Sequence, residues 1–223
     1  MKVGITGLLA VVVATASLAA QAPGGRANQA PGPSVTVNGQ TFTQQSLFQR
    51  NVGGPDDMYT PVPPHRVIGN IYYVGTKSLA VFLIVTPAGN ILINSTFERN
   101  VPVIQKSIEQ LGFTFTDTKI LLGSHAHGDH QEGDAMVKQM TGAQVMAMEQ
   151  DVPALKNMTV GNKPHPIDRV LKDGDTVTLG GTTLTAHLTP GHTRGCTTWT
   201  MKVQDGAKSY NVNITCGGLQ DGA

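Results

Sequence analysis

The sequence Ser-His-Ala-His-Gly-Asp-His occupies residues 124–130, directly after the apolar residues Ile-Leu-Leu at 120–122. Three histidines and one aspartate therefore fall within six positions. Imidazole nitrogen and carboxylate oxygen are ligands that zinc accepts in proteins. We therefore predict a metal-binding loop that follows a buried strand, in preference to a His-rich turn that binds metal adventitiously.

The spacing within this loop predicts how the ligands divide. His125 and His127 are two positions apart, so in an extended backbone their side chains point to the same side and can reach one metal ion. Gly128 permits a tight turn, after which Asp129 and His130 face a neighbouring position. One loop can therefore supply most of the ligands of two adjacent metal sites.

A third ligand is predicted far along the chain. His192 follows a Pro-Gly pair, which is typical of a turn, at the end of a predicted strand. Together with His125 and His127 it would give three protein ligands and leave the fourth position of a tetrahedral zinc open to water. Three ligands plus water describe a catalytic zinc, whereas four protein ligands describe a structural one.

These motifs resemble a known family. The pattern His-x-His-x-Asp-His after a strand, followed about sixty residues later by Gly-His-Thr, is similar to that of the metallo-β-lactamase superfamily. The run at 189–200, Thr-Pro-Gly-His-Thr-Arg-Gly-Cys-Thr-Thr-Trp-Thr, resembles more closely the third subclass (B3) of class B β-lactamases. The resemblance begins near Tyr59 and continues to the end of the chain. It implies an α/β fold, the αββα sandwich of that superfamily, with zinc as the cofactor.

The resemblance also implies a division of the ligands into two zinc sites. The first would contain His125, His127 and His192, and the second would include Asp129 and His130. In the family the third ligand of the second site is a histidine from a later segment, and no histidine follows His192 in this sequence. We therefore expect a C-terminally incomplete chain that lacks the last strands and helices, leaves part of an apolar sheet face uncovered, and has a complete first site but an incomplete second site.

The two cysteines are open to three interpretations. An even count in an exported protein is consistent with a disulfide between Cys196 and Cys216. The resemblance offers a second interpretation, in which Cys216 joins Asp129 and His130 as a metal ligand. A third is that both cysteines are unpaired core residues.

One position departs from the family pattern. Where the family often has an aspartate at the end of a strand before the first helix, this chain has Asn94. An asparagine can still form hydrogen bonds but carries no charge. The substitution is expected to loosen the support of the metal loop without changing the ligands.

Length and composition predict one globular domain. The chain has 223 residues, a net charge of +1 and 39% hydrophobic residues, which is enough for a sizeable core. The near-zero charge gives no electrostatic reason to expect nucleic acid or an acidic membrane surface as a partner. We expect a monomer whose partners are a small-molecule substrate and metal.

The N-terminal sequence predicts export. Lys2 precedes a short apolar run and a small-residue exit, which is typical of a signal peptide over residues 1–20 and implies a periplasmic or secreted protein. Residues 21–34 are rich in Pro, Gly, Ala and Asn and are predicted to be a disordered lead-in. The truncated metallo-β-lactamase domain would then occupy residues 35–223.

Hydrophobic periodicity outlines the elements of this domain. Alternating and apolar runs predict strands, and apolar residues three and four apart predict helices. The expected strands are 66–74, 79–86, 90–93, 119–122, 144–148, 170–179, 182–188, 197–204 and 210–215, and the expected helices are 41–50, 100–111, 134–140 and 150–156.

Three further histidines are assigned no ligand role. His65 is expected to be structural or to lie near substrate, and His165 to lie in a solvated polar loop over 157–166. His187, within a predicted strand, is expected to support the ligands or to lie in the core.

The resemblance implies an exported zinc-dependent hydrolase that opens the β-lactam ring of antibiotics. A zinc ion lowers the pKa of its bound water from near 16 to about 7, and the resulting hydroxide would attack the lactam carbonyl. Asp129 would orient this nucleophile and handle its proton. The alternatives are a lactone or thioester hydrolase of the same superfamily, or an inactive zinc-binding fragment.

Overall fold

The computed structural model describes residues 34–43, 46 and 54–216. The predicted signal peptide, almost all of the predicted lead-in and most of the helix predicted at 41–50 lie outside these residues. The start of that helix is instead part of a hairpin of β1 (Ser34–Val37) and β2 (Gln40–Thr43). This hairpin belongs to the first of two compact units, residues 1–47, so the domain boundary predicted at residue 35 falls within that unit. All the elements described below belong to the second unit.

The larger sheet of the second unit has seven strands in the order β11-β8-β7-β6-β5-β4-β3. Strands β3, β4, β5 and β6 pair antiparallel in chain order, and the pairs β6-β7, β7-β8 and β8-β11 are parallel. The bounds are β3 His65–Ile68, β4 Ile71–Tyr73, β5 Phe82–Thr86, β6 Gly89–Ile93, β7 Thr118–Leu122, β8 Gln144–Met148 and β11 Arg169–Leu171.

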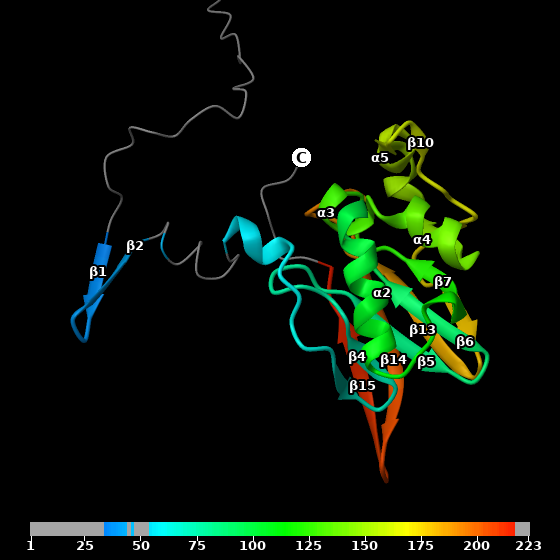
Figure 1. Cartoon of the computed structure of the whole chain (residues 1–223), viewed down its shortest axis with the longest axis horizontal. Coiled ribbons are helices and arrows are strands. Elements are labelled where there is room, and N and C mark those ends of the chain that lie inside the picture. Colours follow the sequence, from blue (N-terminus) through cyan, green and yellow to red (C-terminus); the bar gives the residue numbers. More distant parts are fainter. Residues whose placement is uncertain (1–33, 44–45, 47–53, 217–223) are drawn as a thin grey trace, which may run out of the picture. The chain divides into compact units, whose positions relative to one another are not determined.

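This sheet is buried on both faces. Helices α2 (Val101–Gln110) and α4 (Asp134–Thr141) pack on one face, and a second sheet packs on the other (Figure 1). On β6, Ile91 and Ile93 point into the core between the sheets, whereas Leu92 points towards the helices, because successive side chains of a strand face opposite ways. The central strands therefore read as continuous apolar runs.

The second sheet is antiparallel, in the order β12-β13-β14-β15. Leu184 and Ala186 of β13 are buried against the first sheet, whereas the alternate residues Thr183 and Thr185 point outwards. The outer face is therefore polar, and the expectation of an exposed apolar face is wrong. Threonine suits this position because its branched side chain favours strands and its hydroxyl is compatible with water. The bounds are β12 Thr176–Leu179, β13 Thr182–Leu188, β14 Thr197–Asp205 and β15 Lys208–Ile214.

The layers are thus helix, sheet and sheet, which agrees with the predicted sandwich in three of its four layers. A fourth, helical layer on the second sheet is not among the described elements. No helix within the described ranges is long and apolar enough to cross a membrane. The remaining short elements are η1 Pro55–Met58, η2 Glu98–Asn100, η3 Phe115–Asp117, α3 Gly128–Gln131, η4 Glu149–Asp151, α5 Val152–Asn157, β9 Thr159–Val160 and β10 Lys163–Pro164.

Asp168 links α4 to the first sheet just before β11. Its Oδ2 accepts a hydrogen bond from the backbone N–H of Val145 at 2.8 Å, and its Oδ1 pairs with the ammonium group of Lys138. Partial burial alone would raise the pKa of this carboxyl, but the bonds from Lys138 and Val145 hold the pKa below its ordinary value of 3.8. A carboxyl whose pKa is lowered by folding stabilises the fold above its ordinary pKa, and this contribution disappears as the pH falls through the lowered value.

We predict that Asp168→Asn lowers the free energy of unfolding by about 1 kcal/mol at pH 7. The difference from the wild type should shrink as the pH falls from the ordinary pKa of 3.8 through the lowered pKa of the folded carboxyl. Urea unfolding at pH 7 and pH 3 measures both values. The exposed Asp117→Asn serves as the control and should change neither; an equal loss for Asp168→Asn at both pH values would contradict the prediction.

Candidate metal centre

The predicted metal loop begins where β7 ends, and Asn94 at the end of the adjacent β6 supports it. Asn94 has a left-handed backbone (φ 67°), which asparagine tolerates better than most residues. Its Oδ1 accepts from the N–H of Ser124 at 2.9 Å, and its Nδ2 donates to the carbonyl of Ala80 at 3.2 Å. An ionised aspartate could not make the second bond, because it has no donor. In this chain the neutral amide therefore bonds the loop through its oxygen and is itself held by Ala80 through its nitrogen.

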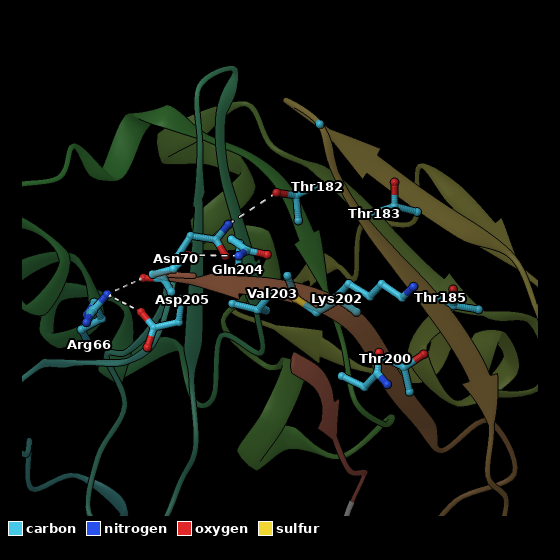
Figure 2. A pocket seen from close by; sticks show the side chains of 15 residues that line it. Arg66, Asn70, Thr182, Thr183, Thr185, Thr200, Lys202, Val203, Gln204 and Asp205 are labelled. Atoms are coloured by element: carbon cyan, nitrogen blue, oxygen red, sulfur yellow. Dashed lines mark hydrogen bonds and ion pairs between the residues drawn. The ribbon is translucent and has the colours of Figure 1, made fainter. Parts of the chain in front are cut away.

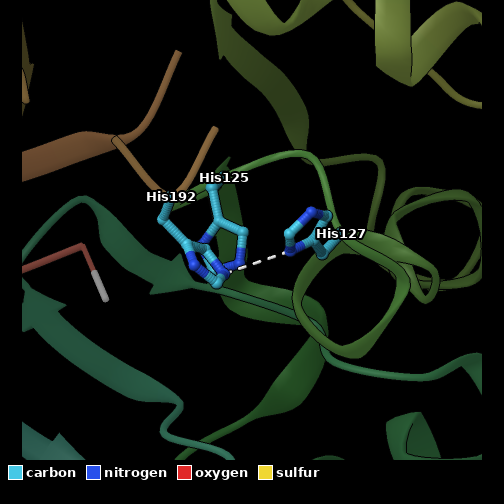
Figure 3. Close-up of side chains that lie close together, drawn as sticks. All are labelled: His125, His127 and His192. Carbon is cyan, nitrogen blue, oxygen red and sulfur yellow. Dashed lines mark hydrogen bonds between the residues drawn. The ribbon is translucent and has the colours of Figure 1, made fainter. Parts of the chain in front are cut away.

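The structure brings the three predicted first-site histidines together. Figure 3 shows the rings of His125, His127 and His192 converging on one space, and one nitrogen from each lies within 4.8 Å of the others. The Nδ1 atom of His127 and the Nε2 atom of His192 are 3.1 Å apart. Residues separated by 65 positions in the chain thus form one cluster.

The donor atoms of this cluster fit a zinc ion. The Nε2 atom of His125 is buried and has no hydrogen-bond partner, while its Nδ1 lies 3.1 Å from the hydroxyl of Ser124. Two nitrogens bound to a tetrahedral zinc at about 2.0–2.1 Å would be roughly 3.4 Å apart, close to the observed separation of the His127 and His192 nitrogens.

The electrostatic environment favours the form of histidine that binds metal. Burial, followed by the proximity of His130, His192 and His127, lowers the pKa of His125 to about 2. The ring is therefore neutral at physiological pH, as a metal ligand must be.

Asp129 and His130 lie beside this cluster. Together with His125 they form a second group whose ligand atoms lie within 4.8 Å of one another. The Oδ2 of Asp129 is 3.6 Å from the Nε2 of His130, and the hydroxyl of Ser124 lies 3.2 Å from the Nδ1 of His130. All five predicted ligands therefore lie in one place. Ser124, which the sequence did not single out, lies within hydrogen-bond distance of two of them.

Cys216 is not available as a metal ligand, because it forms a disulfide with Cys196. The antiparallel register of β14 and β15 places Trp199 opposite Ile214 and so brings the two cysteines together, with their Cα atoms 5.8 Å apart. The interpretations of Cys216 as a ligand and of both cysteines as unpaired are therefore wrong. The disulfide adjoins the centre, since the Sγ of Cys216 lies 3.6 Å from the Nδ1 of His125.

The remaining histidines lie outside both ligand groups. His65 is exposed on β3 and its ring stacks on that of Tyr73. His187 is half-buried on the outer face of β13, where its Nε2 is 2.7 Å from the hydroxyl of Thr200, so it is not a core residue.

His165 corrects another expectation. Its side chain is only 2% exposed, so the predicted solvated position is wrong. Its Nε2 lies 3.0 Å from the Oδ2 of Asp134, and the hydroxyl of Ser95 donates to the Oδ1 of Asp134 at 2.5 Å. Burial raises the pKa of Asp134. This pair joins the segment after β10 to the start of α4.

A large groove lies away from the centre, on the outer face of the second sheet (Figure 2). It has a volume of about 910 Å³ and is lined by polar side chains, among them Thr182, Thr185 and Lys202. None of the five predicted ligands lines it. The histidine cluster, and not this groove, is therefore the candidate site.

Comparison with known proteins identifies the family. The chain is 54% identical to the native FEZ-1 metallo-β-lactamase of Legionella gormanii, with a TM-score of 0.66 over 70% of this chain and 63% of that one. For a point mutant of the same enzyme the identity is 51%, the TM-score is 0.70, and the match covers 77% of this chain and 69% of the other. The chain belongs to the metallo-β-lactamase family.

Other matches are consistent with this membership. BJP-1 of Bradyrhizobium japonicum, a subclass B3 metallo-β-lactamase, is 42% identical, with a TM-score of 0.67 over 72% of this chain and 64% of that one. The predicted likeness to the third subclass is thus confirmed. A hydroxyacylglutathione hydrolase of Hyphomonas neptunium is 36% identical over 87 residues, which are 39% of this chain and 29% of that protein. No family model matches the sequence. The chain spans about two thirds of the solved enzymes and matches less than a third of this curated relative.

The buried pair generates a prediction about stability. We predict that His165→Ala lowers the free energy of unfolding by about 3 kcal/mol, because Asp134 then stays buried without its imidazole partner. Urea unfolding measures the loss. His65→Ala, which removes an exposed ring, is the control and should cost less than about 1 kcal/mol. Equal losses for the two variants would show that the buried pair contributes nothing specific.

Proposed function

We propose that this protein is a zinc-dependent hydrolase that opens the β-lactam ring, with His125, His127 and His192 as the zinc ligands. The main support for this proposal is that the three rings converge on one space. The Nε2 atom of His125 in this cluster is buried and has no hydrogen-bond partner. The identity to FEZ-1, at 51% over 77% of this chain, supports the choice of substrate.

When bound, zinc would supply a water molecule of lowered pKa and a positive charge that polarises a carbonyl oxygen. The residues of the chain would then hold and move protons. Asp129 lies in the first turn of α3 with its side chain 36% exposed, so its carboxylate can accept a proton from water and remain accessible to substrate. Ser124 keeps the rings of His125 and His130 oriented, since its hydroxyl lies within 3.2 Å of both.

Asp129 and His130 would contribute to a second zinc site. The only third candidate ligand near them in the described part of the chain is His125, which the first site already requires. We therefore propose that the described residues complete the first site but not the second. We also propose an exported monomer that acts on a small molecule, on the basis of its N-terminal sequence and near-zero net charge.

Thioester hydrolysis is a second candidate function. It is favoured by the match to a hydroxyacylglutathione hydrolase at 36% identity over 87 residues. That match covers 39% of the chain, whereas the match to the FEZ-1 mutant covers 77% at higher identity. We therefore propose a β-lactam, rather than a thioester, as the substrate class.

We predict that the full chain hydrolyses a carbapenem in preference to a glutathione thioester or an acyl-homoserine lactone. Chelation should abolish the activity and added zinc should restore it. His192→Ala should lower hydrolysis by more than about a hundredfold, which exceeds the usual effect of changing a residue that only supports a ligand. His187→Ala, a histidine outside both ligand groups, is the matched control and should retain activity.

Three outcomes would contradict this proposal in different ways. Full activity of metal-free protein would exclude a metal-dependent mechanism. Hydrolysis of the thioester alone would establish the second candidate. Less than one zinc per chain without turnover of any substrate would identify an inactive fragment.

A further inference from the structure

Asp151, at the end of η4, is a buried carboxylate with no role in the proposed chemistry. Asp151 is only 3% exposed. Among the described residues, no cationic side chain pairs with it. It occupies the N-cap position of α5, yet its side chain makes no capping bond to that helix. Burying a carboxylate costs free energy unless hydrogen bonds compensate for the lost hydration. The groups that bond to Asp151 therefore indicate its role.

Within residues 34–43, 46 and 54–216, three groups donate hydrogen bonds to this carboxylate, and all of them belong to the two segments that carry the first-site histidines. The Oδ2 of Asp151 accepts from the N–H of Ala126 and from the hydroxyl of Thr193, both at 2.8 Å. The Oδ1 accepts from the N–H of Gly195 at 2.7 Å. Ala126 lies between His125 and His127, and Thr193 directly follows His192.

The fit around this carboxylate is close. A Cβ atom at Gly195 would lie 2.6 Å from the Cγ of Asp151 and 2.6 Å from its backbone nitrogen. Real Cβ atoms do not approach so closely, so only glycine allows the N–H to reach the carboxylate. The close contact fixes the segment after His192 against Asp151.

We propose that Asp151 is a positioning residue for the metal centre. It holds the backbone between His125 and His127 against the backbone after His192, and so keeps the three rings converged before metal binds. A carboxylate suits this task because both of its oxygens accept hydrogen bonds. The amide of asparagine has an NH₂ group in place of one oxygen, and this group would face another donor instead of accepting its hydrogen bond. The inference rests on the proposed metal centre and adds a residue that acts only through the ligands.

The test compares zinc affinity and metal-site geometry in Asp151→Asn and the wild-type full chain. We expect the zinc dissociation constant, measured by competition with a chromophoric chelator, to rise by about 10- to 100-fold. The visible spectrum of the Co²⁺-loaded variant should also differ from that of the wild type, because the ligand positions relax.

Asp168→Asn is the matched control. It removes another carboxylate that accepts a backbone N–H, but one bonded to Val145 and Lys138 away from the ligand segments. It should lower the stability of the metal-free protein and leave zinc affinity unchanged. If both variants weaken zinc binding equally, affinity simply follows global stability and the proposal is overturned.

Thr193→Val tests the same role without removing the carboxylate. It deletes one donor and preserves the shape of the side chain, and we expect a rise of about fivefold in the dissociation constant, equivalent to one hydrogen bond. If Asp151→Asn does not fold, Thr193→Val provides the test. A zinc dissociation constant for Thr193→Val equal to that of the wild type would then overturn the proposal. If the wild type and Asp151→Asn bind zinc equally tightly, the role of Asp151 is overturned but the metal centre is not. If the wild type binds no zinc, the proposed centre itself is overturned.

Discussion

Hydrogen bonds between the start of β14 and the loop after β7 hold the candidate centre together. The N–H of Thr197 donates to the carbonyl of Ser124 at 2.7 Å, and the indole N–H of Trp199 donates to the carbonyl of Gly123 at 3.1 Å. Trp199 is also buried in the core between the sheets. The packing of the two sheets therefore sets the position of His192 relative to His125 and His127, and Asp151 adds a direct link between the ligand segments.

A second support lies beneath the loop, at the end of β6. The N–H groups of Ser95 and Thr96 both donate to the carbonyl of His130 at 2.9 Å. Thr96 has a φ of 58°, a left-handed conformation that is costly for a β-branched residue. Strained backbone of this kind persists only where surrounding contacts hold it, and it is frequent near functional sites. Here the hydrogen bonds of Ser95 and Thr96 fix the end of α3, the helix that carries Asp129 and His130.

Much of the fold and four of the five ligand candidates could be predicted from local sequence, whereas His192 is predicted from its Pro-Gly turn far along the chain. The continuous apolar runs of β6 and β7 reflect burial on both faces, the alternation in β13 reflects burial on one face, and four of the candidates lie in a single loop. Asp151 and the pair of Asp134 with His165 could not be found in this way. Each depends on partners far away in the chain, and an isolated polar residue carries no periodic signal. The disulfide depended similarly on the register of β14 with β15, which the sequence leaves open.

The proposed centre requires that three imidazoles meet around one metal ion. X-ray absorption spectroscopy at the zinc edge of the loaded full chain tests this directly, because it distinguishes nitrogen from sulfur ligands and detects the rings of histidine. We expect histidine nitrogens at about 2.0–2.1 Å from the zinc and no sulfur ligand. A sulfur neighbour at about 2.3 Å, or a zinc coordinated without histidine, would contradict it.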